Sequence, residues 1–275
     1  DVTFTSSTRV SIDGNDYAEP WCGSATSNGG TRCRYDYVSE RAIQPDSKAV
    51  GATINHTYRL GNEREFFAEA MLQQNTGSAY DSAAAFDVRV DGDASFVPAW
   101  AQAIDAEDGD VNQIRIRSRF PERRIQDYDS QSYRLLAGLR GELGEWSWET
   151  AATYGKTDNE ITHVSGYMGI DKVADALADG SFNPFNLGRD NSDSVIAGLR
   201  EIAPRLGESD VYSVDFNFSG TLFADISAVF GGEFRGEEIS DNPAEVAQSG
   251  GIFALGASDA AADRTCLLYT SPSPR

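Results

Sequence analysis

Hydrophobic and polar residues alternate with a period of two in several stretches of the chain. In residues 50–60 most even positions are apolar, and most odd positions are small or polar. The alternation resumes in residues 65–73 after the short segment Gly61-Asn62-Glu63-Arg64. Successive side chains of a β-strand point to opposite faces, so this pattern predicts two strands with one apolar face. The Gly-Asn segment between them is typical of a tight turn, which makes the pair an antiparallel hairpin.

The same unit occurs twice more. Residues 133–143 and 146–154 alternate around a short break, and so do residues 212–219 and 226–235. The predicted turns of the three hairpins are Gly61-Asn62, Gly144-Glu145 and Leu222–Asp225.

Two long polar connectors separate the hairpins, near Gly77–Tyr128 and Thr157–Ser209. Loops of such length count against a compact soluble domain. Short periplasmic turns and long extracellular loops are, however, typical of outer-membrane barrels. We therefore expect an all-β fold, namely an antiparallel transmembrane β-barrel fragment with about six to eight strands of a larger barrel. The alternative is an ordinary β-sandwich, whose strands also alternate.

Aromatic residues flank the predicted turns, with Tyr58 and Phe66 beside one turn and Trp146 and Trp148 beside another. Trp and Tyr concentrate at membrane–water interfaces, so this placement supports the barrel. The turns are then expected to face the periplasm, and the long connectors the outside. So few strands cannot close a barrel, so we expect a curved open sheet with unpaired edges.

Composition excludes two other classes of protein. The chain has 275 residues, a net charge of -20 and a mean hydropathy of -0.42. No apolar run is long enough for a transmembrane helix. Because no basic domain is present to neutralise phosphates, we expect no nucleic-acid partner. No apolar leader begins at Asp1, and we expect the natural start to lie upstream.

Several segments resemble TonB-dependent outer-membrane receptors of proteobacteria. The main one is the hairpin from Arg134 to Gly155, RLLAGLRGELGEWSWETAATYG. The others, in the order of the family, are Cys33-Arg-Tyr-Asp-Tyr, Ile43-Gln-Pro-Asp-Ser, Phe182-Asn-Pro-Phe185, Ser213-Val-Asp-Phe-Asn-Phe-Ser-Gly220 and Phe230-Gly-Gly-Glu-Phe-Arg235. Each motif is weak by itself, but together they span nearly all of the chain before Cys266.

The resemblance implies a location in the outer membrane of a Gram-negative bacterium, in contact with lipid and lipopolysaccharide. It implies active uptake of a scarce nutrient, such as a ferric siderophore, a cobalamin, an oligosaccharide or a peptide, and no cofactor. The TonB complex would be a partner through an N-terminal region that is not in this sequence. The family's TonB box, plug domain and terminal aromatic strand are also missing here. Alternatives are a passive porin and a secreted β-rich binding module.

Two parts of the chain are therefore expected. Residues 1–265 would form a partial receptor barrel. Residues 266–275 resemble the translation of a transposase-type sequencing adapter, and we expect that they do not belong to the natural protein.

Cys22 and Cys33 lie in a segment rich in Gly, Ser, Thr and Asn, which is typical of a loop. Two nearby cysteines in an exported chain favour a disulfide. A metal site is the alternative, although no CxxC pair or histidine cluster supports it.

Three candidate binding segments stand out. Arg115, Arg117 and Arg119 alternate on a predicted strand, so they would share one side and bind an anionic substrate or lipopolysaccharide phosphates. Pairing with carboxylates is the alternative for them. Phe182, Asn183 and Phe185 would either pack a loop or contact substrate. The acidic run 105–110 lacks EF-hand spacing and is expected to be a hydrated loop, so no metal site is expected.

The polar positions of the alternating strands would face the barrel lumen. They are Thr53, Asn55, Arg59, Glu69, Gln73, Arg134, Arg140, Glu149, Asp215, Asn217, Glu233 and Arg235.

No catalytic residues are predicted. The chain has two histidines. His56 falls on the apolar face of a strand, and His163 lies in a segment expected to be a solvated loop. Neither belongs to a recognisable catalytic motif, and we expect no enzyme.

Overall fold

The computed structural model describes residues 5–42, 44–61, 63–105, 113–223 and 226–270. These residues form two antiparallel β-sheets, and neither sheet closes into a barrel. The all-β class and the open sheet are therefore confirmed. The larger sheet has seven strands in the order β13-β12-β11-β10-β9-β6-β5. Their bounds are β5 (Asp46–Gly61), β6 (Arg64–Asp81), β9 (Arg124–Leu143), β10 (Trp146–Ser165), β11 (Ala203–Phe223), β12 (Ile226–Pro243) and β13 (Ala260–Thr270).

The three predicted hairpins are present, and the strands of each pair up to the predicted turn; Asn62 and residues 224–225 of two of these turns lie outside the described residues. The hairpins are β5–β6, β9–β10 and β11–β12, and all are antiparallel. Their strands have 16 to 21 residues, which is much longer than the alternating segments of the sequence. The extra length lies on the side away from the short turns, where polar residues occupy both faces and the period-two pattern is lost.

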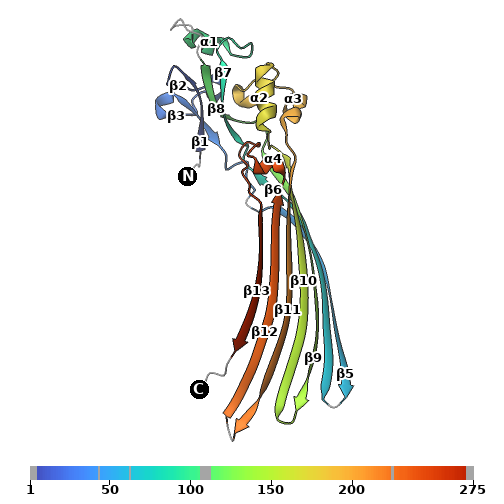
Figure 1. Ribbon diagram of the computed structural model, residues 1–275. Helices are drawn as coiled ribbons and strands as arrows, with labels where there is room; N and C mark the ends of the chain where they lie inside the picture. Colours follow the sequence, from blue (N-terminus) through green and yellow to red (C-terminus); the bar gives the residue numbers. More distant parts are fainter. Residues whose placement is uncertain (1–4, 43, 62, 106–112, 224–225, 271–275) are drawn as a thin grey trace.

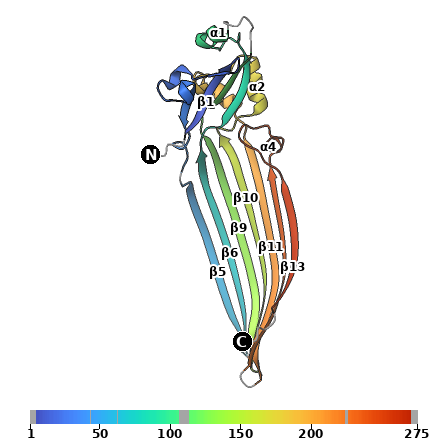
Figure 2. The ribbon, with the colours of Figure 1, turned by 90° about the vertical axis from the view of Figure 1, so that its left-hand side faces the viewer.

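The smaller sheet forms a cap at the far end of the long strands (Figures 1 and 2). Its strand order is β3-β4-β1-β8-β7, and β2 pairs with β1. The bounds are β1 (Thr5–Ile12), β2 (Asn15–Tyr17), β3 (Thr26–Ser27), β4 (Arg32–Asp36), β7 (Ala85–Asp91) and β8 (Gln113–Arg119). The helices are α1 (Ala99–Asp105), α2 (Ile170–Ala178), α3 (Asp193–Leu199) and α4 (Glu245–Gln248), with short 3-10 turns at η1 (Pro20–Cys22), η2 (Asn28–Gly30) and η3 (Asn186–Gly188).

The prediction that the two long connectors are loops was wrong. The first contains β7, α1 and β8, and the second contains α2, η3 and α3. Both connectors supply the cap with buried side chains, among them Phe86, Phe120 and Phe182. Their apolar residues occur in short runs such as 83–90 and 114–120, which are separated by polar segments. No single run is long enough to show by itself which other run it packs against. The connectors form a core only because the hairpins bring both of them to one end.

The cap has an ordinary hydrophobic core. The ring centroids of Phe86 and Phe120 are 4.7 Å apart, and that of Phe182 lies 6.1 Å from Phe120. Helix α2 covers this cluster with Val173, Ala176 and Leu177, whose spacing places them on one helical face. The cap is therefore held by burial of apolar surface, which the long sheet does not have.

Strand β13 continues through Cys266 to Thr270, and residues 266–270 pair with Gly231–Arg235 of β12. The ladder is thus not interrupted at residue 265. The expected foreign origin of residues 266–275 stays a prediction.

Aromatic rings lie over glycines of the neighbouring strand at several directly opposite positions. These pairs are Phe67–Gly138, Trp146–Gly220 and Tyr212–Gly236. A Cβ atom built on Gly236 would lie 2.2 Å from Cζ of Tyr212, which is inside van der Waals contact. The glycines therefore make room for the rings, a device known to stabilise sheets.

We expect Gly236→Ala to lower the free energy of unfolding by about 1–3 kcal/mol, because the new methyl group overpacks the Tyr212 ring. The measurement is denaturant unfolding of the full chain in detergent. Gly207→Ala is the matched control, since its Cβ would meet its nearest neighbours at an ordinary 3.8 Å. Equal stability of the two variants would contradict the role assigned to Gly236.

Candidate functional site

The long sheet has two faces of opposite character. Directly opposite residues of antiparallel strands share a face. The register pairs Tyr58 with Phe66, Phe66 with Leu139, and Trp148 with Phe218, so the apolar alternation of every strand falls on the same side. We call this side the apolar face.

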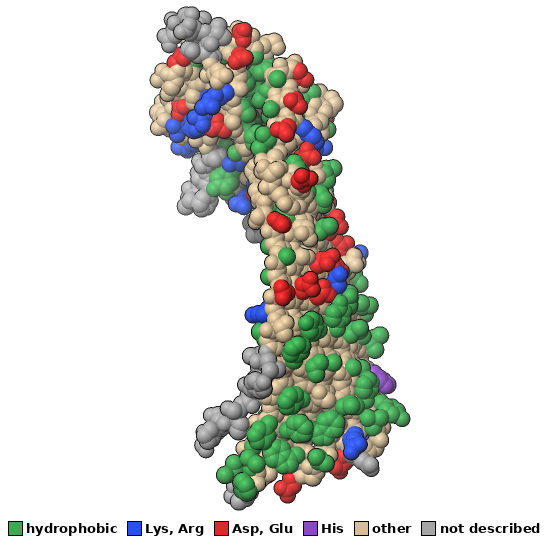
Figure 3. Space-filling view, viewed as in Figure 1, with side chains coloured by type: hydrophobic (Ala, Val, Ile, Leu, Met, Phe, Trp, Pro, Cys, Tyr) green, Lys and Arg blue, Asp and Glu red, His purple; other side chains and the backbone are tan. Residues whose placement is uncertain are grey.

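Many large apolar side chains on the apolar face are exposed, by 38% to 70% of their surface. Figure 3 shows them gathered on the part of the sheet near the short turns, with acidic side chains above them. We call this region the apolar belt. Its exposed members include Val50, Ile54, Tyr58, Leu60, Leu72, Leu135, Leu139, Leu143, Val214, Phe216, Phe218, Phe230 and Phe234. A contiguous exposed apolar surface of this kind marks contact with a membrane or another apolar partner.

The belt ends within about two residues of the same level on neighbouring strands. The first polar residues beyond it on this face include Gln74, Gln131, Lys156, Asp210 and Glu238. The register pairs Gln74 with Gln131, Lys156 with Asp210, and Asp210 with Glu238. Between β9 and β10 the boundary steps by two residues, since Gln131 pairs with Asp158 and Lys156 pairs with Tyr133. The boundary thus crosses the sheet with a small step, which sequence position alone does not reveal.

Aromatic residues border the belt on both sides. Tyr154 lies opposite Tyr212 near the polar boundary, and the ring centroids of Tyr133 and Tyr154 are 5.9 Å apart. Trp146 stacks on Phe230 at the turn side, with ring centroids 5.8 Å apart. Trp146 and Tyr154 are eight positions apart, about 27 Å along a strand that rises about 3.4 Å per residue. Apolar bands of membrane barrels are about 25 Å tall and carry aromatic girdles at both edges.

The opposite face of the long sheet is polar. The register places all twelve residues predicted to face a lumen on this one face. Arg134 contacts Glu69 at 3.4 Å, and Nε of Arg140 donates to Glu65 at 2.7 Å. Two of the predicted arginines are thus neutralised across strands. The structure shows the shared face, whereas the lumen itself stays a prediction.

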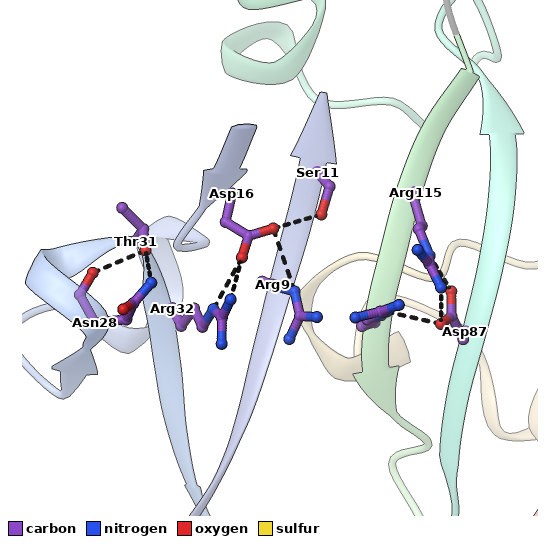
Figure 4. Close-up of polar contacts among 9 residues, drawn as sticks. Arg9, Ser11, Asp16, Asn28, Thr31, Arg32, Asp87 and Arg115 are labelled. Atoms are coloured by element: carbon purple, nitrogen blue, oxygen red, sulfur yellow. Dashed lines mark hydrogen bonds and ion pairs between the residues drawn. The ribbon is translucent and has the colours of Figure 1, made fainter. Parts of the chain in front are cut away.

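The predicted arginine cluster lies on β8 in the cap, and the register places its three residues on the outer face of the small sheet. Figure 4 shows Arg115 beside Asp87 on this face. Asp87 on β7 accepts two hydrogen bonds from Arg115, at 2.7 and 2.6 Å, and one from Nε of Arg117 at 2.7 Å. Arg119 donates to the Ala83 carbonyl at 2.6 Å and lies over the Tyr35 ring. The carboxylate pairing weighed from the sequence is therefore present for Arg115 and Arg117.

The segment Phe182–Phe185 packs inside the cap. Phe182 and Phe185 are buried, and the Phe185 ring meets that of Trp100 edge-on at 6.3 Å. The Asn183 side chain accepts a hydrogen bond from the Phe185 N–H at 3.0 Å, which shapes the turn. Of the two roles expected for this segment, these contacts support packing of a loop. The two rings are buried and cannot touch a dissolved substrate.

The disulfide between Cys22 and Cys33 is confirmed. It closes residues 22–33, shortly after Glu19, whose carboxyl is buried and hydrogen-bonded to the first residue of η3. Glu19 accepts hydrogen bonds from the Asn186 backbone N–H at 2.7 Å and from Nε1 of Trp21 at 3.1 Å. Burial raises the pKa of Glu19 despite these two donors. The Glu19 carboxyl thus links the first segment of the cap to the second connector. Its burial makes the charged form less stable than it would be in water.

The two histidines occupy different environments. His56 lies on the apolar face of β5, as predicted. The prediction that His163 is a solvated loop residue was wrong: it is buried on β10, its Nδ1 lies 2.7 Å from the Ala203 carbonyl, and its ring packs on Tyr167. Among the described residues no group of His, Cys, Asp and Glu is placed to hold a metal. The acidic run 105–110 lies almost wholly outside the described residues.

Sequence reasoning missed the arginines that surround the predicted cluster. Arg9 on β1, Arg32 and Arg34 on β4, and Arg89 on β7 have the same outward position. The signal was present, since Arg9 precedes the alternating Val10 and Ile12, and Arg89 lies between Val88 and Val90. These strands are short and far apart in the sequence, so their pairing was not apparent.

The raised pKa of Glu19 predicts a pH effect on stability. A carboxyl with a folded-state pKa above the ordinary 4.5 contributes its full stability below that value, and loses it as the pH rises through the folded-state pKa. We expect the thermal midpoint of the parent chain to fall, relative to that of Glu19→Gln, as the pH rises from about 4 to about 8. Glu63→Gln, at an exposed turn, is the control and should track the parent. Parallel curves for the parent chain and Glu19→Gln would contradict the prediction.

Comparisons with known proteins do not assign the site. No family model, no curated protein and no solved structure matches the chain significantly. In the described part of the chain, no helix is both long and apolar enough to span a membrane. The functional argument therefore rests on the geometry of the two sheets.

Proposed function

We propose that the chain is part of the wall of a transmembrane β-barrel in the outer membrane of a Gram-negative bacterium. The apolar belt carries this proposal. It is continuous over adjacent strands, exposed, bordered by aromatic residues, and about as tall as the apolar band of a membrane barrel. A soluble sheet would have to cover such a surface, because water opposes its exposure.

We further propose that the complete protein is a TonB-dependent receptor for active uptake of a nutrient. The resemblance of the motifs from Cys33 to Arg235 supports this step. The folded cap supports it too, because it stands at the end where extracellular loops would lie and offers a surface for capturing a solute (Figure 2). In the complete barrel, the polar face of the long sheet would line the path of that solute.

A charge in the middle of the apolar belt tests the membrane proposal. Ile54 is 70% exposed on β5. We expect Ile54→Arg to destabilise the chain by about 2–4 kcal/mol in a bilayer, as arginine does on the lipid face at the midplane. On a water-exposed surface the same change would cost at most about 0.5 kcal/mol.

Asn55→Arg is the matched control, since Asn55 is the next residue on the same strand and points to the opposite face. The measurement is unfolding of the full chain in lipid vesicles. Equal stability of the two variants, or folding of the chain in buffer without detergent, would contradict the barrel proposal and favour a secreted β-rich binding module.

The genomic locus tests the receptor proposal. We expect its sequence to encode a plug domain and a TonB box before Asp1, and further strands ending in an aromatic residue after Thr265. A barrel gene without a plug would indicate a passive porin. A reading frame that opens near Asp1 and stops soon after Arg275 would contradict the receptor.

A further inference from the structure

The outer face of the small sheet is a local exception to the acidity of the chain. Outward positions on its strands hold seven arginines, and the same face carries four aspartates. The arginines are Arg9, Arg32, Arg34, Arg89, Arg115, Arg117 and Arg119, and the aspartates are Asp16, Asp36, Asp87 and Asp91. The whole chain, in contrast, has a net charge of -20. An anion is therefore attracted to this face and repelled elsewhere.

The sheet opens at one seam within this face. Strands β1 and β8 pair from Ser11 and Arg115 to Arg9 and Arg117, and the pairing stops there. Before Arg9, β1 pairs only with β4, and after Arg117, β8 pairs only with β7. Thr8 and Ser118 occupy the next positions, where the two strands have separated.

A groove of about 490 Å³ lies at this opening. We call it the seam groove. On the outer face three arginines, Arg9, Arg117 and Arg119, and one carboxylate, Asp87, line it. Phe86 and Phe253 contribute apolar surface from the core side. The volume is within the usual range of about 300–1,000 Å³ for small-molecule sites. Apolar walls lower the local dielectric and so strengthen the attraction between the arginines and an anion.

Two hydroxyl groups in the seam groove are buried without partners. Thr8 is 1% exposed and Ser118 is 4% exposed, and both line the groove. Among the described residues, neither Thr8 Oγ1 nor Ser118 Oγ has a hydrogen-bond partner. A buried polar group without a partner costs about 1–3 kcal/mol, so two of them side by side call for a functional explanation.

The arginines of the groove are held in place before any ligand binds. Asp16 contacts Nε of Arg9 at 3.2 Å, and Asp87 accepts from Nε of Arg117 at 2.7 Å (Figure 4). A guanidinium carries further N–H donors on its two terminal nitrogens, and these donors form a fork that suits carboxylate and phosphate oxygens. The aspartates thus fix the orientation of the arginines, which reduces the entropy lost on binding.

We propose that the seam groove binds a small soluble oxyanion that carries carboxylate or phosphate groups. Arg9, Arg117 and Arg119 supply the positive charge, and the hydroxyls of Thr8 and Ser118 donate to the ligand's oxygens. This inference does not depend on the membrane proposal, since the groove belongs to the cap alone. If the outer-membrane proposal also holds, the oxyanion is the chemical class of the nutrient that the receptor captures.

The test is a calorimetric titration of the full chain in detergent with two probes, citrate and inorganic pyrophosphate. We expect saturable binding of at least one probe. Arg117→Gln should weaken it about tenfold or more, which is about 1.4 kcal/mol. Arg34→Gln is the matched control because Arg34 lies on the same face but outside the groove, and it should change the affinity little.

The double variant Thr8→Val with Ser118→Ala separates a binding role from a structural one. We expect it to weaken binding while leaving the free protein as stable as the parent or more stable, because two unpartnered hydroxyls are removed. A variant that loses stability together with affinity would show that the hydroxyls serve the fold, and the assigned ligand contacts would be wrong.

Three other outcomes would overturn the proposal. The first is no binding of either probe at millimolar concentration. The second is an equal loss in Arg34→Gln and Arg117→Gln, which would show unspecific attraction to the whole face. The third is binding to phosphatidylglycerol vesicles without binding to either soluble probe, which would assign the arginines to lipid headgroups. Because Ile54→Arg is assayed separately, failure of the groove and failure of the membrane proposal remain distinguishable.

Discussion

The antiparallel hydrogen-bond ladder is the constraint on which the rest of the structure depends. Strands of 16 to 21 residues extend far beyond any hydrophobic core, so backbone pairing holds the long sheet together. Such pairing is required wherever a chain crosses an apolar layer, because no water is present there to satisfy N–H and C=O groups. The ladder also fixes the register, and the register sorts every side chain to one of two faces. A slip of a single residue would move the apolar belt to the polar side.

The cap is stabilised differently from the long sheet, mainly by a buried hydrophobic core. Its sheet is short, its core is buried, and the Cys22–Cys33 disulfide and the arginine–aspartate pairs brace its surface. The long sheet and the cap are linked because both long connectors leave the hairpins at the same end of the long sheet. Stability and function conflict at the seam groove, since the strand separation that opens the groove also leaves the hydroxyls of Thr8 and Ser118 without partners.

Several elements were predictable because their information is local. The turn at Gly144 follows from one glycine with positive φ between two alternating runs, and the Cys22–Cys33 pair follows from proximity in sequence. The cap was not predictable in the same way. Ile114 and Ile116 pack with Val10 from a segment about a hundred residues away, and no short window contains that contact. His163 was misplaced for a related reason, since its strand extends beyond the region where one face is apolar.

The sequence by itself determined the three hairpins and the shared face of the twelve polar positions, because a period of two assigns each residue to a face before any partner is known. Tertiary structure decided the features that depend on pairing between distant strands. The position of the belt's boundary across the sheet follows from the register of the strand ladders. The arginine-rich face needs β4, β1, β8 and β7 side by side, and the seam groove needs β1 and β8 to part beyond Arg9 and Arg117. Those contacts join residues far apart in the chain, and only the folded backbone brings them within hydrogen-bonding distance.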